Sequence, residues 1–278
     1  MRRRSRIVTV AAPTARLFHI ARGGIMAAGN ETDMVNIHHR EPMNPVPDAE
    51  ALGLFEKQWR LYRKFVENDY GGHAGAARAL HELLTATFQR PFAILDLGCG
   101  DATSIVSALD GTAVAHYHGV DMATPALDLA ASNLDQLDCE IELEHGDYVE
   151  AMRERPEHAD VVWIGLSLHH FEASGKRELM SEIRQAVGPG GMFVTYEPTS
   201  LPGESRAAYL DRYEAIGRDD WTALTAKDFK HLMDHVRSAD FPESTSGWQA
   251  LGEAAGFTAF DTLYRNDTNL FHMFRFGA

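Results

Sequence analysis

The sequence predicts an α/β protein with a mostly parallel sheet and helices on both faces. From residue 92 onward, short apolar runs alternate with segments of helical periodicity, a glycine-rich turn follows the first run, and a short turn joins the last two. The run Phe92–Leu97, bounded by Pro91 and Gly98, has the continuous apolar composition of a buried parallel strand. With 278 residues, we expect one large domain or a core domain with an insertion.

The apolar runs alternate with helical segments in a fixed order. The expected strands are 92–97, 115–120, 140–145, 161–166, 192–197, 257–263 and 270–276. The expected helices are 74–88, 102–109, 124–134, 148–153, 176–187 and 248–256. Because Arg265-Asn266-Asp267 is too short for a helical crossover, the last two strands are expected to form a hairpin, which makes the sheet mixed at one edge.

Three segments lie outside this alternation. Residues 1–47 are polar and broken by prolines, which indicates a flexible arm; the first 25 residues contain six arginines and no acid. That composition fits a targeting leader, but we favour a mis-assigned start, with translation from Met26 or Met34. Residues 48–90 are expected to form an N-terminal helical lid. Within the domain 91–278, residues 198–247 form a cap insertion with expected helices at 205–216 and 227–239.

Charge and cysteine content exclude several classes of protein. The formal net charge is -14, and without the basic first 25 residues it is -20, so we expect neither nucleic acid nor an anionic membrane as a partner. Cys99 and Cys139 cannot form a disulfide framework, which favours a reducing compartment, and we expect a cytoplasmic protein. No apolar run approaches the length of a membrane span.

The loop after the first strand is the most informative segment. In Asp96-Leu97-Gly98-Cys99-Gly100, two glycines stand between a strand and a helix, where the backbone turns tightly and approaches a ligand closely. A dinucleotide fingerprint would have a third glycine at position 103, which is Thr. The carboxylate of Asp96 would repel a pyrophosphate and suits a cationic or amino group. An NAD-dependent oxidoreductase is therefore the less favoured alternative.

Polar side chains also follow the next strands. Asp121 ends the second strand about 20 residues after the glycine loop, where a carboxylate can bind ribose hydroxyls. Met122 offers an apolar surface for a base, and Asp147-Tyr148 follows the third strand. Ser167 through His170 follow the fourth strand at its carboxyl end, where open α/β sheets bind ligands.

The order and spacing of these motifs resemble the class I S-adenosylmethionine (SAM)-dependent methyltransferases, in the branch that acts on small molecules. The resemblance covers about Phe92 to Ala278 and is carried by 94–100, 119–121, 146–147, 168–171 and 188–191. It implies a Rossmann-like seven-stranded sheet with an antiparallel last strand, and SAM as cofactor with S-adenosylhomocysteine (SAH) as product. The implied cofactor-binding residues are Asp96, Gly98, Cys99 and Gly100 at the methionine moiety, Asp121 at the ribose, and Met122, Asp147 and Tyr148 near the base. Ser167, at the carboxyl end of the fourth strand, is also expected to bind the cofactor.

A methyl group on a sulfonium centre is already activated, so a general base is needed only when the acceptor arrives protonated. His169 is the first candidate for this base because it lies at the expected mouth of the cleft and titrates near neutrality. In the alternative interpretation, His169 and His170 only shape the loop. Glu197 ends the fifth strand and could accept a hydrogen bond from the acceptor.

The cap is expected to bind the acceptor. With His170, the candidate contacts are Arg206, Tyr209 and Tyr213, which suit a carboxylate or an aromatic ring; the alternative is a solvated helix face. His231 and His235 share a helix face, but without an evident third ligand we expect no metal site. The sequence thus predicts methyl transfer from SAM to O, N or S of a small molecule. A non-catalytic binding or regulatory protein of the same fold is the alternative, and a homodimer remains open.

Overall fold

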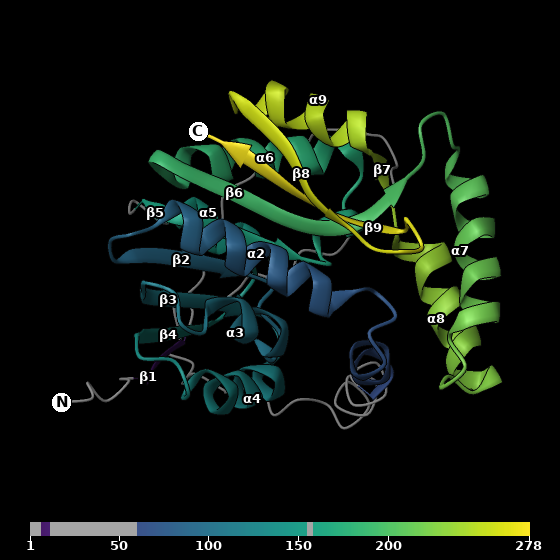
Figure 1. Cartoon of the computed structure of the whole chain (residues 1–278), viewed down its shortest axis with the longest axis horizontal. Coiled ribbons are helices and arrows are strands. Elements are labelled where there is room, and N and C mark those ends of the chain that lie inside the picture. Colours follow the sequence, from purple (N-terminus) through teal and green to yellow (C-terminus); the bar gives the residue numbers. More distant parts are fainter. Residues whose placement is uncertain (1–6, 12–59, 155–157) are drawn as a thin grey trace, which may run out of the picture.

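The computed structural model describes residues 7–11, 60–154 and 158–278, whose strands form a mixed sheet (Figure 1). These strands are β1 (Ile7–Ala11), β2 (Phe92–Leu97), β3 (Val114–Asp121), β4 (Glu140–His145), β5 (Ala159–Gly165), β6 (Val187–Ser200), β7 (Glu243–Ser244), β8 (Ala259–Arg265) and β9 (Phe271–Gly277). They follow the order β1-β4-β3-β2-β5-β6-β9-β8, and β7 pairs with β6. Strand β9 runs antiparallel to both of its neighbours, β6 and β8. The predicted mostly parallel sheet with an antiparallel last strand is confirmed.

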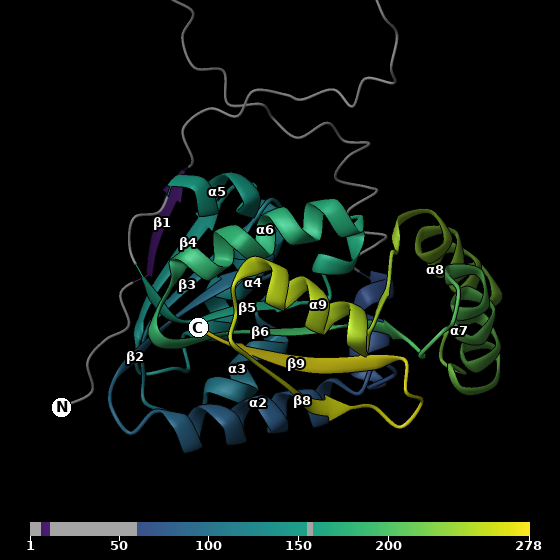
Figure 2. The same cartoon turned by 90° about the horizontal axis from the view of Figure 1, so that it is seen from above.

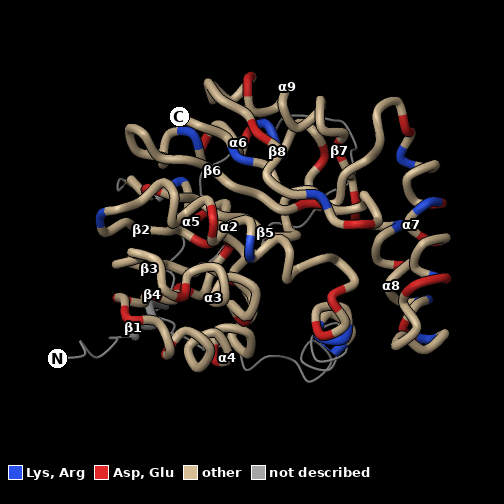
Figure 3. Tube along the Cα trace, in the orientation of Figure 1, with Lys and Arg blue, Asp and Glu red and all other residues tan. Residues whose placement is uncertain are grey.

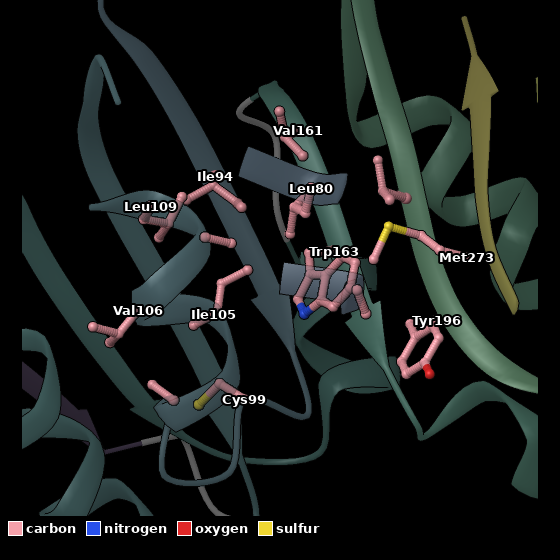
Figure 4. Packing of buried hydrophobic residues seen from close by; sticks show 14 of the residues in the cluster. Leu80, Ile94, Cys99, Ile105, Val106, Leu109, Val161, Trp163, Tyr196 and Met273 are labelled. Atoms are coloured by element: carbon pink, nitrogen blue, oxygen red, sulfur yellow. The ribbon is translucent and has the colours of Figure 1, made fainter. Parts of the chain in front are cut away.

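Helices cover both faces of the sheet. The first face carries α2 (His73–Thr87), α3 (Thr103–Leu109) and α4 (Thr124–Leu134), and the second carries α5 (Tyr148–Glu154), α6 (Ala173–Ala186) and α9 (Thr245–Ala255). Figure 2 shows α2 and α3 on one side of the strands and α6 and α9 on the other. Side chains alternate between two hydrophobic cores: Ile94 and Trp163 belong to the first, shown in Figure 4, whereas Leu95 and Val162 belong to the second.

The cap insertion contains the two helices expected for it. They are α7 (Arg206–Asp220) and α8 (Ala226–Ala239), which lie beyond one end of the sheet (Figure 1). Helix α7 begins after Ser205, whose side chain accepts a hydrogen bond from the Ala208 N–H, and Thr225 and Asp228 form a capping box for α8. In the part of the chain that the structure describes, no helix is long and apolar enough to cross a membrane.

The N-terminal segment differs from the sequence expectation. Residues 7–11 were expected to belong to a flexible arm, but they form β1, parallel to β4, with Ile7 opposite Ile141. An apolar, β-branched run suits a strand and pairs here with the edge of β4, so the sheet has a strand beyond the seven expected. The rest of the arm and the first part of the lid lie outside the described residues, and residues 60–67 are helical.

A buried lysine joins the end of the cap to the helices of the second face. Lys176 on α6 is fully buried, and its ammonium donates hydrogen bonds to the Phe241 carbonyl and to Glu243 Oε1 at 2.8 Å. The same ammonium lies 5.4 Å from the ring centre of Trp248. These contacts fix the segment that connects α8 with β7.

Replacing Lys176 should therefore destabilise the fold. Lys176→Ala leaves a carbonyl and a carboxylate without their buried cation, and we expect the free energy of unfolding to fall by about 2–4 kcal/mol. Urea unfolding measures this change. The control is Arg177→Ala at an exposed neighbour, expected within about 0.5 kcal/mol of the parent protein. Equal losses in both variants would contradict the role of Lys176.

Candidate active site

The glycine loop after β2 borders a cavity of about 480 Å³, here called the loop cavity, at the carboxyl end of the sheet. Gly98 and Gly100 have φ angles of 72° and 55°, which glycine adopts without strain. A Cβ on Gly98 would lie 3.3 Å from Ser167 Oγ, so the loop passes close to the turn after β5. Among the expected cofactor contacts, those that line the cavity are Asp96, Gly98, Cys99, Gly100, Asp121, Met122, Tyr148 and Ser167.

Asp121 is held in place by the backbone at the end of β3. Its Oδ2 accepts a hydrogen bond from the Gly100 N–H at 2.9 Å, and its Oδ1 accepts one from the Ala123 N–H at 2.8 Å. The carboxylate is half-buried and retains lone pairs for further donors. It therefore offers two oriented acceptors to a diol in the loop cavity, as expected for a ribose.

Asp96 is a buried carboxylate that lacks a cationic partner among the described residues. It is 2% exposed and accepts a hydrogen bond from the Tyr117 hydroxyl at 2.7 Å. Burial raises the pKa of Asp96, the Tyr117 hydrogen bond lowers it and the nearby Asp121 carboxylate raises it, and the resulting pKa is about 7. A ligand with an ammonium group beside Asp96 would favour the charged carboxylate and offset the cost of burying it.

Of the residues expected near the base, Met122 and Tyr148 line the loop cavity and Asp147 does not line it in the described structure. Met122 is 68% exposed at the rim of the loop cavity, and the Tyr148 hydroxyl lies 2.9 Å from Ser167 Oγ. Asp147 is exposed, and its Oδ1 accepts a hydrogen bond from the Val149 N–H at 2.8 Å. This hydrogen bond uses one carboxylate oxygen at the start of α5, and the base contact expected of Asp147 stays a prediction.

Cys99 is a buried thiol beneath the loop. Burial and the adjacent carboxylates of Asp96 and Asp121 raise the pKa of its thiol far above its ordinary value. A Cβ added to Gly119 would lie 2.9 Å from its sulfur atom, which shows how closely Cys99 packs on β3. The neutral thiol is a packing group and not a nucleophile.

The turn after β5 is organised around the carboxylate of Glu197, which lies within β6, three residues before its end. Its Oε1 accepts hydrogen bonds from the Leu168 N–H at 2.9 Å, the Ser167 N–H at 3.3 Å and the Thr195 hydroxyl at 3.0 Å. Its Oε2 accepts from the His169 N–H at 3.2 Å and lies 2.6 Å from His169 Nδ1. The charge is thus stabilised by donors from two elements.

The structure corrects the expected role of Glu197. This side chain was expected to face the cleft and accept a hydrogen bond from the acceptor, but it is fully buried and its oxygen atoms already have protein donors. A carboxylate only accepts, so the Nδ1 of His169 carries the hydrogen and Nε2 is left for another partner. Glu197 is therefore a positioning residue for His169.

A second cavity of about 850 Å³, here called the cap cavity, lies between the turn, the cap and residues 60–65. His169 lines it, and Leu166, Tyr62 and His170 line both this cavity and the loop cavity. Leu166 has a φ angle of 55°, a strained backbone conformation for a leucine, where the two cavities meet. A ligand in one cavity is thus within reach of a ligand in the other.

The cap contributes a different set of side chains from the expected one. Tyr213 lines the cap cavity, but Arg206 and Tyr209 do not line it in the described structure. Arg206 donates to the backbone carbonyls of Asp240 and Arg237 at 2.7 Å each, and Tyr209 is fully buried in the core. Both were expected to bind substrate. Instead they stabilise the cap, because arginine also donates hydrogen bonds to the carbonyl groups at helix ends and tyrosine also packs in hydrophobic cores.

Several cavity residues were not predicted as cofactor or acceptor contacts. Tyr62, His73, Trp163 and Tyr196 line the loop cavity. The two-residue repeat of a strand could have identified Trp163 and Tyr196, since both lie on the Asp96 face of the sheet. Asp240, which lines the cap cavity, follows α8 and had no local signal. His231 and His235, which were expected to share a helix face without forming a metal site, also line that cavity.

Residues 94–191 match a family model described as a methyltransferase domain. A search of curated proteins found no significant match. The matched segment runs from within β2 into β6 and includes the glycine loop, Asp121 and the turn after β5. The chain therefore contains a SAM-dependent methyltransferase domain.

Solved methyltransferases share its class I fold. An O-methyltransferase family protein from Burkholderia thailandensis is similar with a TM-score of 0.60 and 17% identity, covering 83% of this chain and 62% of that chain. The plantazolicin methyltransferase BpumL, solved with a monoazolic desmethylPZN analog and SAH, is similar with a TM-score of 0.57 and 13% identity, covering 82% and 93%. At these identities the likeness shows the fold.

The loop cavity fits SAM. Its volume lies within the range of small-ligand sites, its glycine loop allows close approach, and Asp121 presents two acceptors to the ribose. Asp96 would face the methionine amino group. The carboxylates of Asp96 and Asp121 thus provide hydrogen-bond acceptors for the amino group and the ribose hydroxyls of SAM.

The ribose contact gives the first test of this site. Asp121→Ala should weaken SAM binding by about 1–3 kcal/mol, because two charge-assisted hydrogen bonds are lost. Calorimetric titration measures the dissociation constant. Asp128→Ala removes an exposed carboxylate of α4 that does not line the described cavity, so its SAM affinity should equal that of the parent protein. Equal affinities in all three proteins would contradict the assignment of Asp121.

The Asp96 carboxyl should make SAM binding depend on pH. Because its pKa is raised to about 7 without ligand, the carboxyl is mostly protonated at pH 6 and gains charge as pH rises. The SAM ammonium binds the charged form, so we expect affinity to rise between pH 6 and 7.5. Titrations across this range should show the rise in the parent protein and a flatter, weaker profile in Asp96→Asn. An equally steep profile in the variant would refute this role.

Proposed function

We propose that this protein transfers the methyl group of SAM to a small acceptor molecule bound in the cap cavity. The observation that carries the proposal is the junction of the two cavities at Tyr62, Leu166 and His170. Methyl transfer needs the donor carbon and the acceptor atom in line and in contact, with water excluded. Two adjoining cavities of these sizes meet that requirement for a small acceptor.

The lining of the cap cavity favours an acceptor with an anionic group and an apolar or aromatic part. Phe65, Val236 and Phe271 supply apolar surface. Arg60, Lys64 and Lys227 bring positive charge into a protein of net charge -14, and the carboxylate of Asp228 is already paired with Lys64 at 2.6 Å. Figure 3 shows charges of both signs along α7 and α8. The neighbour BpumL, solved with an azole analog, supports a small-molecule acceptor.

When bound, SAM supplies a methyl group already activated by its sulfonium centre. The chain's residues then have three tasks. Asp96 and Asp121 would hold the methionine amino group and the ribose of the cofactor, and the turn held by Glu197 brings His169 to the cap cavity. His169, with Nδ1–H donated to Glu197, has Nε2 free to accept the proton of an O–H or N–H acceptor.

Buried thiols at Cys99 and Cys139 support a cytoplasmic, reducing setting.

A product assay tests this function. The protein is incubated with SAM and a panel of small aromatic, carboxylate-bearing and amine acceptors, and mass spectrometry measures SAH and the methylated product. We expect methylation of acceptors that combine an apolar ring with an anionic group. SAM binding without methylation of any panel member would favour the alternative of a non-catalytic binding protein. Binding of NAD in place of SAM would contradict the proposal.

His169 should act on turnover and not on cofactor binding. With an identified acceptor, His169→Asn should lower kcat by about 10²–10⁴-fold, the usual contribution of a positioned general base. The SAM dissociation constant should stay unchanged, since His169 lines the cap cavity and not the described loop cavity. His116→Asn, at an exposed histidine of β3, is the matched control and should keep the parent kcat. A kcat of His169→Asn equal to that of the parent protein would contradict the assignment of His169 as the general base.

A further inference from the structure

We propose that His169, His170 and Asp240 bind a divalent transition-metal ion at the wall of the cap cavity. The proposal rests on the proposed function, because the ion would hold the acceptor there. The three side chains come from two distant segments, the turn after β5 and the residue that follows α8. Their ligand atoms, one from each residue, lie within 4.8 Å of one another.

The distances suit a shared ion. His169 Nε2 and His170 Nδ1 each lie 3.6 Å from Oδ1 of Asp240. Two ligand atoms at the usual zinc distances, in tetrahedral geometry, are about 3.4 Å apart. These nitrogen atoms are too far from Asp240 Oδ1 for hydrogen bonds but are well spaced for a cation between them. His170 Nδ1 also lies 3.3 Å from the Ala239 carbonyl oxygen, and it would give up this hydrogen bond on binding the ion.

The electrostatics of the cluster also call for a cation. Because Glu197 accepts the Nδ1 hydrogen of His169 at 2.6 Å, the neutral imidazole directs the lone pair of Nε2 toward Asp240. Oδ1 of Asp240 is buried and lacks a hydrogen-bond partner among the described residues. A lone pair facing an unpaired carboxylate oxygen is repulsive unless positive charge lies between them. A histidine whose second nitrogen donates to a carboxylate is the usual arrangement in metal sites.

The cluster is assembled by backbone contacts before any ion binds. The Phe241 N–H donates to the His169 carbonyl at 2.8 Å, which joins the segment after α8 to the turn. Arg206 donates to the Asp240 carbonyl at 2.7 Å and fixes the same segment from α7. Asp240 is only 3% exposed, so its side chain has little freedom to turn away. A rigid, preformed site lowers the cost of ion binding.

The ligand types indicate the kind of ion and its use. Two imidazoles and one carboxylate suit Zn²⁺, Fe²⁺ or Co²⁺ better than Mg²⁺, and three protein ligands leave positions open to the cap cavity. An acceptor hydroxyl bound there loses its proton to solvent more readily. Its oxygen pair then forms the new bond to the methyl carbon, while the pair of the broken S–CH₃ bond stays on sulfur. In the metal-bound protein His169 Nε2 is a ligand and the acceptor proton goes to solvent; in the metal-free protein Nε2 accepts that proton.

Cobalt binding tests the site without an activity assay. Protein purified without a polyhistidine tag is treated with chelator and titrated with CoCl₂, and visible absorption between about 500 and 650 nm reports coordination. We expect one Co²⁺ per chain, displaced by Zn²⁺, and at least a tenfold loss of affinity in Asp240→Asn. The matched control is Asp228→Asn, a carboxylate in the same cavity that pairs with Lys64, which should bind Co²⁺ like the parent protein.

The outcomes separate the metal site from the proposed function. Absence of the cobalt bands, or equal affinity in Asp240→Asn and the parent protein, would overturn the metal site. If circular dichroism shows that Asp240→Asn is unfolded, His170→Asn replaces it, with the same expected loss. SAM titration of the same samples is read separately: SAM binding without cobalt binding refutes only the metal site, whereas failure to bind SAM contradicts the proposed function.

Discussion

The arrangement of both cavities depends on one buried carboxylate. Glu197 lies in β6 inside the protein and accepts hydrogen bonds from three successive backbone N–H groups, of Ser167, Leu168 and His169, and from side chains of Thr195 and His169. A buried charge is costly unless donors surround it, so the turn after β5 must follow the shape that supplies them. That shape sets the common boundary of the two cavities and orients the His169 ring.

The site combines features that favour function over stability. Asp96 is buried without a cationic partner among the described residues, and Leu166 adopts a φ angle of 55°. Each costs free energy in the ligand-free protein, and each lies where a ligand is expected to bind. Because the pKa of Asp96 is raised to about 7, its contribution to the free energy of unfolding falls as pH rises from about 4 to 7. A cationic ligand would recover this loss.

Local patterns predicted most of the fold and located the glycine loop and the strand ends that line the loop cavity. Apolar runs located β2 to β6, and the glycine loop and Asp121 are short-range features that follow strand ends. The acceptor half depends on contacts between distant segments, which local patterns do not reveal. Asp240 lies near His169 only because the cap folds back. Arg206 donates a hydrogen bond to a backbone carbonyl at the end of α8. Likewise, β1 is a strand because β4 offers an edge for it to pair with.

A crystal structure of the protein with SAH tests the central claim, that the two cavities meet at the site of methyl transfer. We expect the ribose hydroxyls to contact Asp121 and the amino group to lie toward Asp96. The sulfur atom should point at the junction formed by Leu166, Tyr62 and His170. A sulfur atom that points away from the cap cavity, or a ribose that does not contact Asp121, would contradict it.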